Sequence, residues 1–341
     1  MANIMVNDVC NMSPMCKYCF ANKYVNGDTS TDISYENFKK AVDWINYSGD
    51  LAGTAQRIGL IGGEPLLHHK LTALIKYVLM QRRPNQAILV FTNGLILDKY
   101  ADYFAKNDIS VLINLNSPKD MGEKQYKRVV ENIKFGRDRN LNMSVGINYY
   151  SKDLNTDFIL SVIEQFNFRD LRLGIVCPNS PAKREEGAFA YFKEIEYSLL
   201  DFTEKAAALG CLVHMDCQTF PKCVLGPDDE RVWAIRDKYR MNTLEFRDSG
   251  CRPVIDILTN LKAVRCFGCS DPELALSIEN FPTEQDMIAW YETNLDNIGK
   301  LIAMDERCVK CSEKQTGRCQ GGCLSYKLEP IKKIMRPLLS K

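Results

Sequence analysis

Short apolar runs alternate with amphipathic stretches along the first two-thirds of the chain. Runs of this length predict buried strands, and stretches with apolar positions at helical spacing predict helices between them. The expected strands lie at residues 3–8, 57–61, 87–92, 109–115, 142–148 and 171–176. The expected helices lie near residues 33–47, 67–82, 98–106, 122–138, 154–167 and 189–209. Such alternation predicts an α/β fold with a parallel sheet, and six units favour a partial (β/α)6 TIM-like barrel over the full eight-unit barrel.

The pattern changes after about residue 210, where cysteines cluster, Pro and Gly increase, and the regular alternation is expected to stop. We therefore expect a barrel over residues 1–212 and a small irregular α+β domain over residues 213–341. One clear helix is expected near 283–303, because Thr283 and Asp286 have the spacing of a capping box. The basic stretch 327–341 predicts a solvated tail or a surface helix.

The composition is that of a globular protein, with 45% hydrophobic and 26% charged residues among 341. Lys and Arg number 44 against 43 Asp and Glu, so no global field favours nucleic acid or an anionic membrane, and neither is expected as a partner. No apolar run approaches the roughly 18 residues of a membrane span, and the N-terminus lacks the pattern of a secretion signal. A cytoplasmic location is expected.

The unusual residue is cysteine, of which the chain has 14. Cytosolic thiols stay reduced, so a cysteine-rich chain in that compartment indicates metal binding rather than disulfides. The chain has only three histidines, which argues against mixed Cys/His zinc sites and against a histidine general base. Ligation by thiolates alone is therefore expected.

The first cysteine group is Cys10, Cys16 and Cys19, directly after the first expected strand. A [4Fe–4S] cluster normally takes four cysteines, so three on one loop suggest a cluster with one iron open to another ligand. The alternatives are a zinc knuckle with a distant fourth ligand, or unligated thiols. Gly62-Gly63-Glu64-Pro65 ends the second expected strand, where glycines allow close backbone approach and a carboxylate can receive an ammonium group. Alone, this sequence could be a strand-to-helix turn with Pro65 at the helix start.

Eight further cysteines of the C-terminal part are candidate ligands, the number that two fully ligated [4Fe–4S] clusters need. Short loops with Gly bring thiolates together, and the last four cysteines could instead form a closed zinc ribbon. Three others are surplus: Cys177 and Cys211 are expected to be small buried hydrophobes, and Cys269 to be that or a spare thiol near a cluster. The eight are Cys217, Cys223, Cys251, Cys266, Cys308, Cys311, Cys319 and Cys323.

Together these features resemble the radical S-adenosylmethionine (radical SAM) superfamily, whose signature is Cys-x3-Cys-x-aromatic-Cys after the first strand and GGEP after the second. Tyr18 occupies the aromatic position, and Cys10 and Cys16 are separated by five residues rather than three. The resemblance covers about residues 3–210. It implies that the open iron binds the amino and carboxylate groups of SAM, with Glu64 and the Gly62–Gly63 backbone holding the ammonium. Strand-end polar residues that would line the same site, or be ordinary strand-end residues, are Thr92, Asn93, Asn116, Ser117 and Asn148.

The C-terminal part resembles a SPASM domain, the auxiliary-cluster extension of radical SAM enzymes that modify peptides and proteins. This chain has seven residues in the middle gap where that pattern usually has five, and no cysteine follows Cys323. The resemblance implies two auxiliary [4Fe–4S] clusters with interleaved ligands, and Cys217 or Cys223 as a replacement for the missing one. The implied sets are Cys251, Cys266 and Cys323 on one cluster, and Cys308, Cys311 and Cys319 on the other.

The same resemblance implies reductive cleavage of SAM to a 5′-deoxyadenosyl radical, with electrons from a flavodoxin- or ferredoxin-type donor, followed by hydrogen abstraction from a substrate. We expect oxidative modification or crosslinking of a ribosomally made peptide. Because the cysteine loop begins at residue 10, recognition of a leader peptide is expected to need a separate protein. Phe267 stands where sulfatase-maturing relatives have an Asp base, which argues against that activity.

Residues after the fifth strand, Tyr149, Tyr150 and Asp153, could face the substrate or could form an ordinary loop. Two other functions stay open at this point. One is a radical SAM enzyme that acts on a small molecule. The other is a zinc-stabilised binding protein without catalytic activity.

Overall fold

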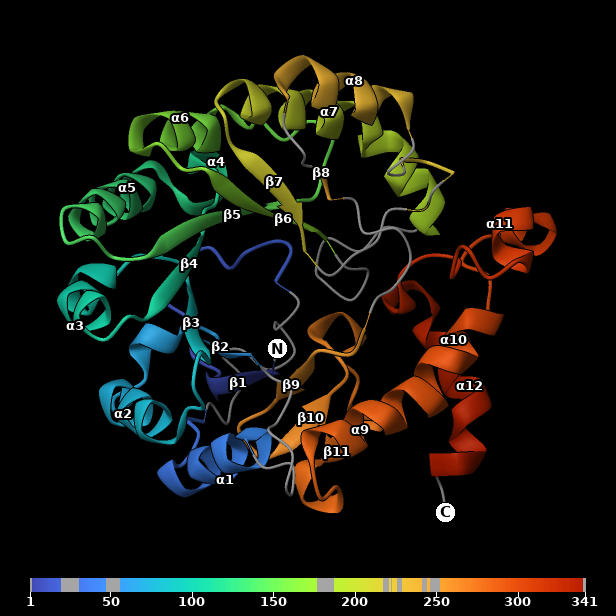
Figure 1. Cartoon of the computed structure of the whole chain (residues 1–341), viewed down its shortest axis with the longest axis horizontal. Coiled ribbons are helices and arrows are strands. Elements are labelled where there is room, and N and C mark those ends of the chain that lie inside the picture. Colours follow the sequence, from blue (N-terminus) through green and yellow to red (C-terminus); the bar gives the residue numbers. More distant parts are fainter. Residues whose placement is uncertain are drawn as a thin grey trace.

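The computed structural model describes residues 2–19, 31–46, 56–176, 187–216, 221, 223–225, 229–240, 244–245 and 252–339. Cys177, Cys217 and Cys251 lie outside these residues. One curved sheet runs through the described chain, with its strands in the order β11-β10-β9-β1-β2-β3-β4-β5-β6-β7-β8. Figure 1 shows these strands around the centre of the view, with α1 to α8 on the outside.

Every neighbouring strand pair from β9 to β8 is parallel, and β10 and β11 are antiparallel additions at one edge. The long strands are β1 (Ala2–Asn7), β2 (Arg57–Gly62), β3 (Ala87–Thr92), β4 (Ser110–Asn114), β5 (Met143–Tyr149) and β6 (Asp170–Ile175). The short strands are β7 (Leu212–Met215), β8 (Leu244–Glu245), β9 (Ile255–Ile257), β10 (Lys262–Val264) and β11 (Leu276–Ser277).

Helices of the barrel connect successive parallel strands. They are α1 (Tyr35–Asn46), α2 (Leu71–Gln81), α3 (Ala101–Lys106), α4 (Pro118–Met121), α5 (Glu123–Arg137), α6 (Asp157–Phe166), α7 (Gly187–Ala208) and α8 (Glu230–Tyr239). The C-terminal helices are α9 (Glu284–Tyr291), α10 (Asn297–Leu301), α11 (Ser312–Gln315) and α12 (Leu328–Leu339).

The six expected strands and the six expected helices between and after them are confirmed, with ends shifted by a few residues. The fold class is also confirmed, because the described sheet ends at β11 and β8 and forms a partial barrel. The expectation that strand and helix stop alternating after residue 210 is wrong. β7, α8 and β8 continue the alternation, but the strands are too short to give a periodic apolar pattern.

The C-terminal region joins the same sheet through β9, which pairs with β1 from Ala2↔Ile255 to Ile4↔Ile257. The boundary predicted between residues 212 and 213 falls at β7, inside the continuous sheet. A division into two functional units therefore stays a prediction.

Two helical expectations in the C-terminal region are confirmed. Thr283 and Asp286 form the capping box of α9, and the helical path continues through a π-helical turn at Glu292–Asp296 into α10. The basic stretch near the C-terminus forms α12, which buries Leu328, Ile331 and Met335 in the main core. It is thus a helix with one packed face.

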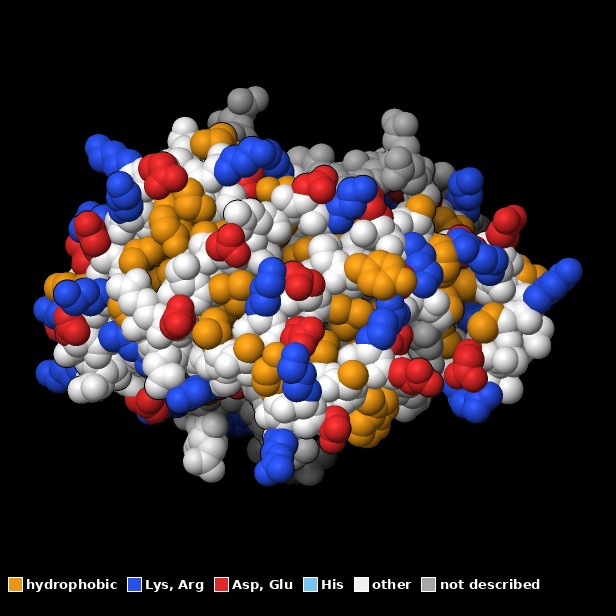
Figure 2. Space-filling model, turned by 90° about the horizontal axis from the view of Figure 1, so that it is seen from above, with side chains coloured by type: hydrophobic (Ala, Val, Ile, Leu, Met, Phe, Trp, Pro, Cys, Tyr) orange, Lys and Arg blue, Asp and Glu red, His pale blue; other side chains and the backbone are white. Residues whose placement is uncertain are grey.

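The alternation of side chains along the strands separates an outer core from the barrel interior. In β1, Ile4 and Val6 pack in the large core beneath the helices, whereas Met5 belongs to a separate apolar cluster. Acidic and basic side chains are interspersed over the face shown in Figure 2, in keeping with the balanced charge. Within the part of the chain that the structure describes, no helix has the length and apolar character of a membrane span.

Candidate active site

The cysteine loop after β1 lies against the end of β2. The backbone N–H of Gly63 donates to the Asn7 carbonyl at 3.0 Å, and that of Glu64 donates to the Val9 carbonyl at 2.6 Å. A Cβ at Gly63 would come within 2.2 Å of the Val9 oxygen, and one at Gly62 within 2.6 Å of the Asn7 oxygen. Both positions require glycine because the loop backbone passes too close for a side chain.

The three loop thiols are half-buried at the carboxyl end of the sheet, where parallel barrels build their sites. Cys10 Sγ accepts the N–H of Met12 at 3.5 Å, and Cys16 Sγ accepts Asn116 Nδ2 at 3.2 Å. Burial raises the pKa of Cys10 to about 11 and also raises the pKa of Cys16. Thiols in such surroundings ionise when a metal cation offsets their charge, so Cys10, Cys16 and Cys19 fit iron ligation.

Glu64 is 1% exposed and joins the end of β2 to the end of β3. Its carboxylate accepts Thr92 Oγ1 at 2.7 Å, the Asn93 N–H at 2.7 Å and the Leu66 N–H at 3.1 Å. Burial raises the pKa of Glu64 to about 7, although these hydrogen bonds act to lower it. Because a carboxylate has about four acceptor sites, little capacity remains for a ligand ammonium. Pro65 follows as the first residue of a 3-10 turn that Glu64 caps.

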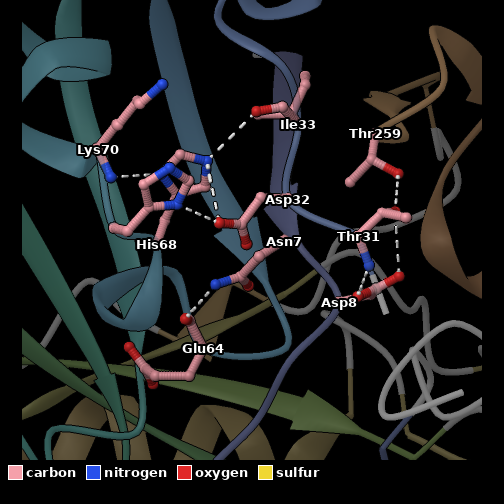
Figure 3. A network of polar contacts seen from close by, with 10 residues as sticks. Asn7, Asp8, Thr31, Asp32, Ile33, Glu64, His68, Lys70 and Thr259 are labelled. Carbon is pink, nitrogen blue, oxygen red and sulfur yellow. Dashed lines mark hydrogen bonds and ion pairs between the residues drawn. The ribbon is translucent and has the colours of Figure 1, made fainter. Parts of the chain in front are cut away.

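Two buried amide oxygens at this end of the sheet, Asn7 Oδ1 and Asn116 Oδ1, have no partner in the described structure. Asn7 uses its Nδ2 on the Glu64 carbonyl at 2.9 Å, as Figure 3 shows, and Asn116 uses its Nδ2 on Cys16. An unsatisfied buried acceptor costs about 1–3 kcal/mol. Both oxygens therefore fit a bound molecule that offers ammonium or hydroxyl donors, as SAM does.

Asn93 and Ser117, the other strand-end predictions, differ in what they contact. Asn93 Nδ2 donates to Asn11 Oδ1 of the cysteine loop at 2.7 Å, so this side chain helps to fix the loop. Ser117 caps α4, where its Oγ accepts the Asp120 N–H at 3.2 Å and donates to the Asp120 carboxylate at 2.7 Å. Ser117 therefore has a structural partner of its own.

Tyr18 and Tyr150 form a stacked pair beside the cysteine loop, with ring centroids 5.7 Å apart. Tyr18 also hydrogen-bonds the side chain of Asn148. Tyr150 donates its hydroxyl to Asp120 Oδ2 at 2.6 Å, and Lys17 Nζ lies 3.0 Å from Asp120 Oδ1. The end of β5 is thereby joined to the cysteine loop.

The prediction that Tyr149 faces the substrate is contradicted. Its side chain is 1% exposed in the main core, with its ring 6.3 Å from that of Phe202. Alternation along β5 places Tyr149 on the face opposite Asn148. Asp153 is exposed in the turn after β5, where its N–H donates to Ser151 Oγ at 3.2 Å.

Arg172 of β6 is a residue that the sequence analysis missed. Its Nη1 donates to Asn114 Oδ1 at 3.2 Å and to Asn148 Oδ1 at 3.1 Å, and its Nε donates to Asp216 at 2.7 Å. A Cβ at Gly146 would come within 3.2 Å of the Arg172 side chain. The guanidinium thus links β4, β5 and the end of β7. The sequence held one signal of this role: Arg172 is a charged residue inside an expected strand, two positions before Gly174.

A small apolar cluster lies between the cysteine loop and the C-terminal region. The backbone N–H of Phe267 donates to Asp256 Oδ2 at 2.7 Å, and Asn3 Nδ2 donates to Asp256 Oδ1 at 2.6 Å. Asp256 is 2% exposed, and burial raises its pKa. At position 267 the side chain beside the cysteine loop is thus an aromatic ring and not a carboxylate. The cluster consists of Met5, Leu258 and Phe267, with Cys10, Cys19 and Ile61 packed against it.

The described C-terminal cysteines fall into two groups. Cys266 and Cys269 form a side-chain hydrogen bond, and Cys269 interacts electrostatically with Cys323. All three are buried. The second group is the set that interacts electrostatically with the exposed Cys223, namely Cys308, Cys311 and Cys319.

Buried cations accompany these cysteine groups. Arg265, 1% exposed, makes a two-pronged ion pair with Asp296 at 2.5 and 2.8 Å and lies 3.8 Å from Cys266 Sγ. Lys327, also 1% exposed, donates to the Gly299 and Gln320 carbonyls at 2.9 and 2.6 Å. Burial lowers the pKa of Lys327 to about 8, whereas nearby thiols of both groups act to raise it. The negative charge of thiolates, or of a cluster bound by them, would be offset by these two buried cations.

A further set of possible ligands lies near the start of α1, where Asp32, His68 and His69 come within 4.8 Å of one another. His68 Nδ1 accepts the Lys70 N–H at 3.1 Å, so its Nε2 carries the proton and donates to the Ile33 carbonyl at 3.3 Å (Figure 3). Neither nitrogen keeps a lone pair for a metal. These residues instead attach the segment before α1 to the turn after β2.

Comparison with known proteins adds the family. Residues 4–158 match the family model of the radical SAM superfamily. A curated protein, the S-adenosylmethionine-dependent nucleotide dehydratase of Selenomonas ruminantium, is 27% identical in an alignment of 178 residues that covers 48% of this chain and 60% of that protein. The matched part of this chain thus spans less than two-thirds of that relative.

Solved structures share the fold over nearly the whole chain. The structure described as native anSMEcpe with bound AdoMet aligns with 99% of this chain and 97% of its own, at a TM-score of 0.64 and 16% identity. A second, native anSMEcpe with bound AdoMet and the Kp18Cys peptide, aligns with the same coverage, TM-score and identity. Residues 4–158 are thus a radical SAM domain, which makes the chain an enzyme, with SAM and a [4Fe–4S] cluster as the cofactors of such a domain, and the non-catalytic alternative is set aside.

Proposed function

We propose that the chain binds its SAM-cleaving [4Fe–4S] cluster through Cys10, Cys16 and Cys19 and oxidatively modifies a peptide. The observation that carries the site is the close approach of the cysteine loop to Gly62 and Gly63, which brings three thiols to the carboxyl end of the sheet. Bound there, the cluster and SAM would supply a 5′-deoxyadenosyl radical for hydrogen abstraction.

The protein's own part in this chemistry is to position SAM. The Asn7 and Asn116 oxygens and the backbone carbonyls of the Gly62–Gly63 turn would accept its donors. Glu64 would act mainly by holding Thr92 and Asn93 in place, since its carboxylate already accepts three hydrogen bonds. The apolar contact of Phe267 with the loop would keep water from the reacting centre.

The C-terminal region is proposed to be a SPASM-like domain with two auxiliary [4Fe–4S] clusters. The likeness to anSMEcpe over 99% of the chain supports the domain, and the two thiol groups support the clusters. A flavodoxin- or ferredoxin-type electron donor, a separate leader-recognition protein and a cytoplasmic location belong to the same proposal.

A peptide substrate is supported by the fold shared with anSMEcpe, which has been solved with bound peptides. Phe267, whose ring lies next to the cysteine loop, speaks against a reaction with a carboxylate base at that place. The second proposal is a small-molecule substrate, supported by the relative described as a nucleotide dehydratase.

The assay that separates the two substrate classes measures 5′-deoxyadenosine formed from SAM under reducing, oxygen-free conditions. We expect a small peptide encoded beside the gene to raise the rate above the substrate-free background and to lose hydrogen mass in mass spectrometry. Nucleoside triphosphates should leave the background unchanged. A response to nucleotides alone would favour the small-molecule proposal, and a Cys16→Ala variant is the inactive control.

A further inference from the structure

Cys269 differs from an ordinary buried cysteine in what surrounds it. Cys211, also 1% exposed, lies in the main core, where its Sγ has only the Leu212 carbonyl at 3.9 Å as a described hydrogen-bond partner. Cys269 is equally buried but contacts the Cys266 thiol and interacts with Cys323. Burial alone therefore does not explain its position.

The backbone holds Cys266 and Cys269 on one short turn. The N–H of Cys269 donates to the Cys266 carbonyl at 2.8 Å, and residues Phe267–Cys269 form a 3-10 turn. Two residues between the cysteines allow both side chains to point to the same side of such a turn, as in many metal-binding loops. The turn packs against the 3-10 segment Leu324–Lys327, which follows Cys323 directly.

Two contacts also fix the start of the turn. Asp256 accepts the Phe267 N–H at 2.7 Å, and Arg265, paired with Asp296, directs Nη1 toward Cys266 Sγ at 3.8 Å. A rigid turn with two converging thiols, a third thiol opposite and a donor to sulfur is the arrangement that iron–sulfur clusters use.

We propose that Cys269 is a ligand of the auxiliary iron–sulfur cluster held by Cys266 and Cys323. The proposal rests on the proposed auxiliary clusters and changes their ligand set, in which Cys269 had no role. It also assigns Cys223, Cys308, Cys311 and Cys319 together to the other cluster.

The test compares reconstituted full-length wild type with Cys269→Ala, Cys269→Ser and the matched control Cys211→Ala. Iron content and electron paramagnetic resonance (EPR) spectra of the oxidised and of the reduced protein are measured without oxygen. We expect about twelve irons in wild type and Cys211→Ala. Cys269→Ala should lose about four irons or show the signal of a three-iron cluster. The serine variant preserves shape and guards against a folding defect, and it should show a changed cluster spectrum.

Full iron content with an unchanged spectrum in both Cys269 variants would overturn the proposal. An equal loss in Cys211→Ala would do so too, because it would mean that any buried thiol affects the clusters. Wild type with only about four irons would instead contradict the auxiliary clusters themselves. Wild type with about eight irons would mean that only one auxiliary cluster is present. In that case the proposal stands if the Cys269 variants lose iron and fails if they keep it.

Discussion

The two cysteine-bearing regions of the molecule are held in different ways. The loop after β1 is fixed by backbone hydrogen bonds to the β2 turn and by neutral amides such as Asn93 and Asn116. The C-terminal cysteines lie among buried ions, with Arg265 paired to Asp296 and Lys327 bound to two carbonyls. The first region is held by close backbone contact at the strand ends. The second is held by buried charged side chains, each of which is stable only while its partner is present.

The largest effect is expected from breaking the buried pair with Asp296→Asn. Removing one partner of a buried ion pair costs about 3–5 kcal/mol of unfolding free energy, because the other charge stays buried. Asp305→Asn removes the exposed pair with Arg307 and should lower the unfolding free energy far less, because water screens this pair. Denaturant unfolding of the reconstituted proteins measures both. Equal losses of unfolding free energy in the two variants would show that the C-terminal region does not depend on its buried ion pair.

The second prediction concerns pH and Glu64 at the strand-end region. Its folded-state pKa of about 7 is above the ordinary value of 4.5, so its contribution to stability is present at low pH and is lost as pH rises through about 7. At about 1.4 kcal/mol per pKa unit, the change is a few kcal/mol at most. Thermal unfolding between pH 4.5 and pH 8.5 should show this loss up to about pH 7 and little further change above it in wild type, and less of the loss in Glu64→Gln. Parallel pH profiles would contradict the assignment.

A smaller loss of stability but a specific loss of function is expected from Gly63→Ala. The added Cβ must displace the Val9 carbonyl, and overpacking of this kind costs about 1–3 kcal/mol. SAM cleavage should fall at least about tenfold, because the displaced loop would misplace the cluster relative to SAM, and a barrier raised by about 1.4 kcal/mol corresponds to that factor. Gly122→Ala, at a positive φ of 85° with no atom within 4 Å of the new Cβ, should lose stability but keep SAM cleavage. Retained cleavage in Gly63→Ala would mean that the close approach is not needed.

The smallest effect is expected from Lys327→Met. Loss of a buried positive charge near both cysteine groups makes reduction of an auxiliary cluster less favourable, so its potential should become more negative. A change on the order of 60 mV corresponds to a tenfold change in the one-electron equilibrium. Potentiometric titration followed by EPR measures it, with the exposed Lys300→Met as control. Unchanged potentials would place Lys327 away from the clusters.

The same contrast explains what could be predicted from the sequence. Strands β1 to β6 and the motif Gly62–Pro65 carry local patterns, so their positions and the loop at Cys10 could be inferred. Arg172 could not be placed at the centre of a network, because its partners Asn114, Asn148 and Asp216 come from other strands. Short strands such as β9 have too few residues to show a period.

The C-terminal cysteines show a second kind of limit. Cys269 was counted as surplus, although Cys266 and Cys269 have the spacing of a ligand pair. Its interaction with Cys323, far away in sequence, has no local signal. Tyr149 was misplaced for a simpler reason. Its neighbours Asn148 and Tyr150 do lie toward the cysteine loop, and the alternation of β5 excludes the residue between them.

The most direct test of the account compares wild type with a Cys10/Cys16/Cys19→Ala triple variant after anaerobic reconstitution. Iron and sulfide content and reductive cleavage of SAM are measured on both. We expect about twelve irons in wild type and about eight in the variant, with 5′-deoxyadenosine formed by wild type alone. Zinc in place of iron without SAM cleavage, or a variant that still cleaves SAM, would contradict the central claim that these three thiols hold the catalytic cluster.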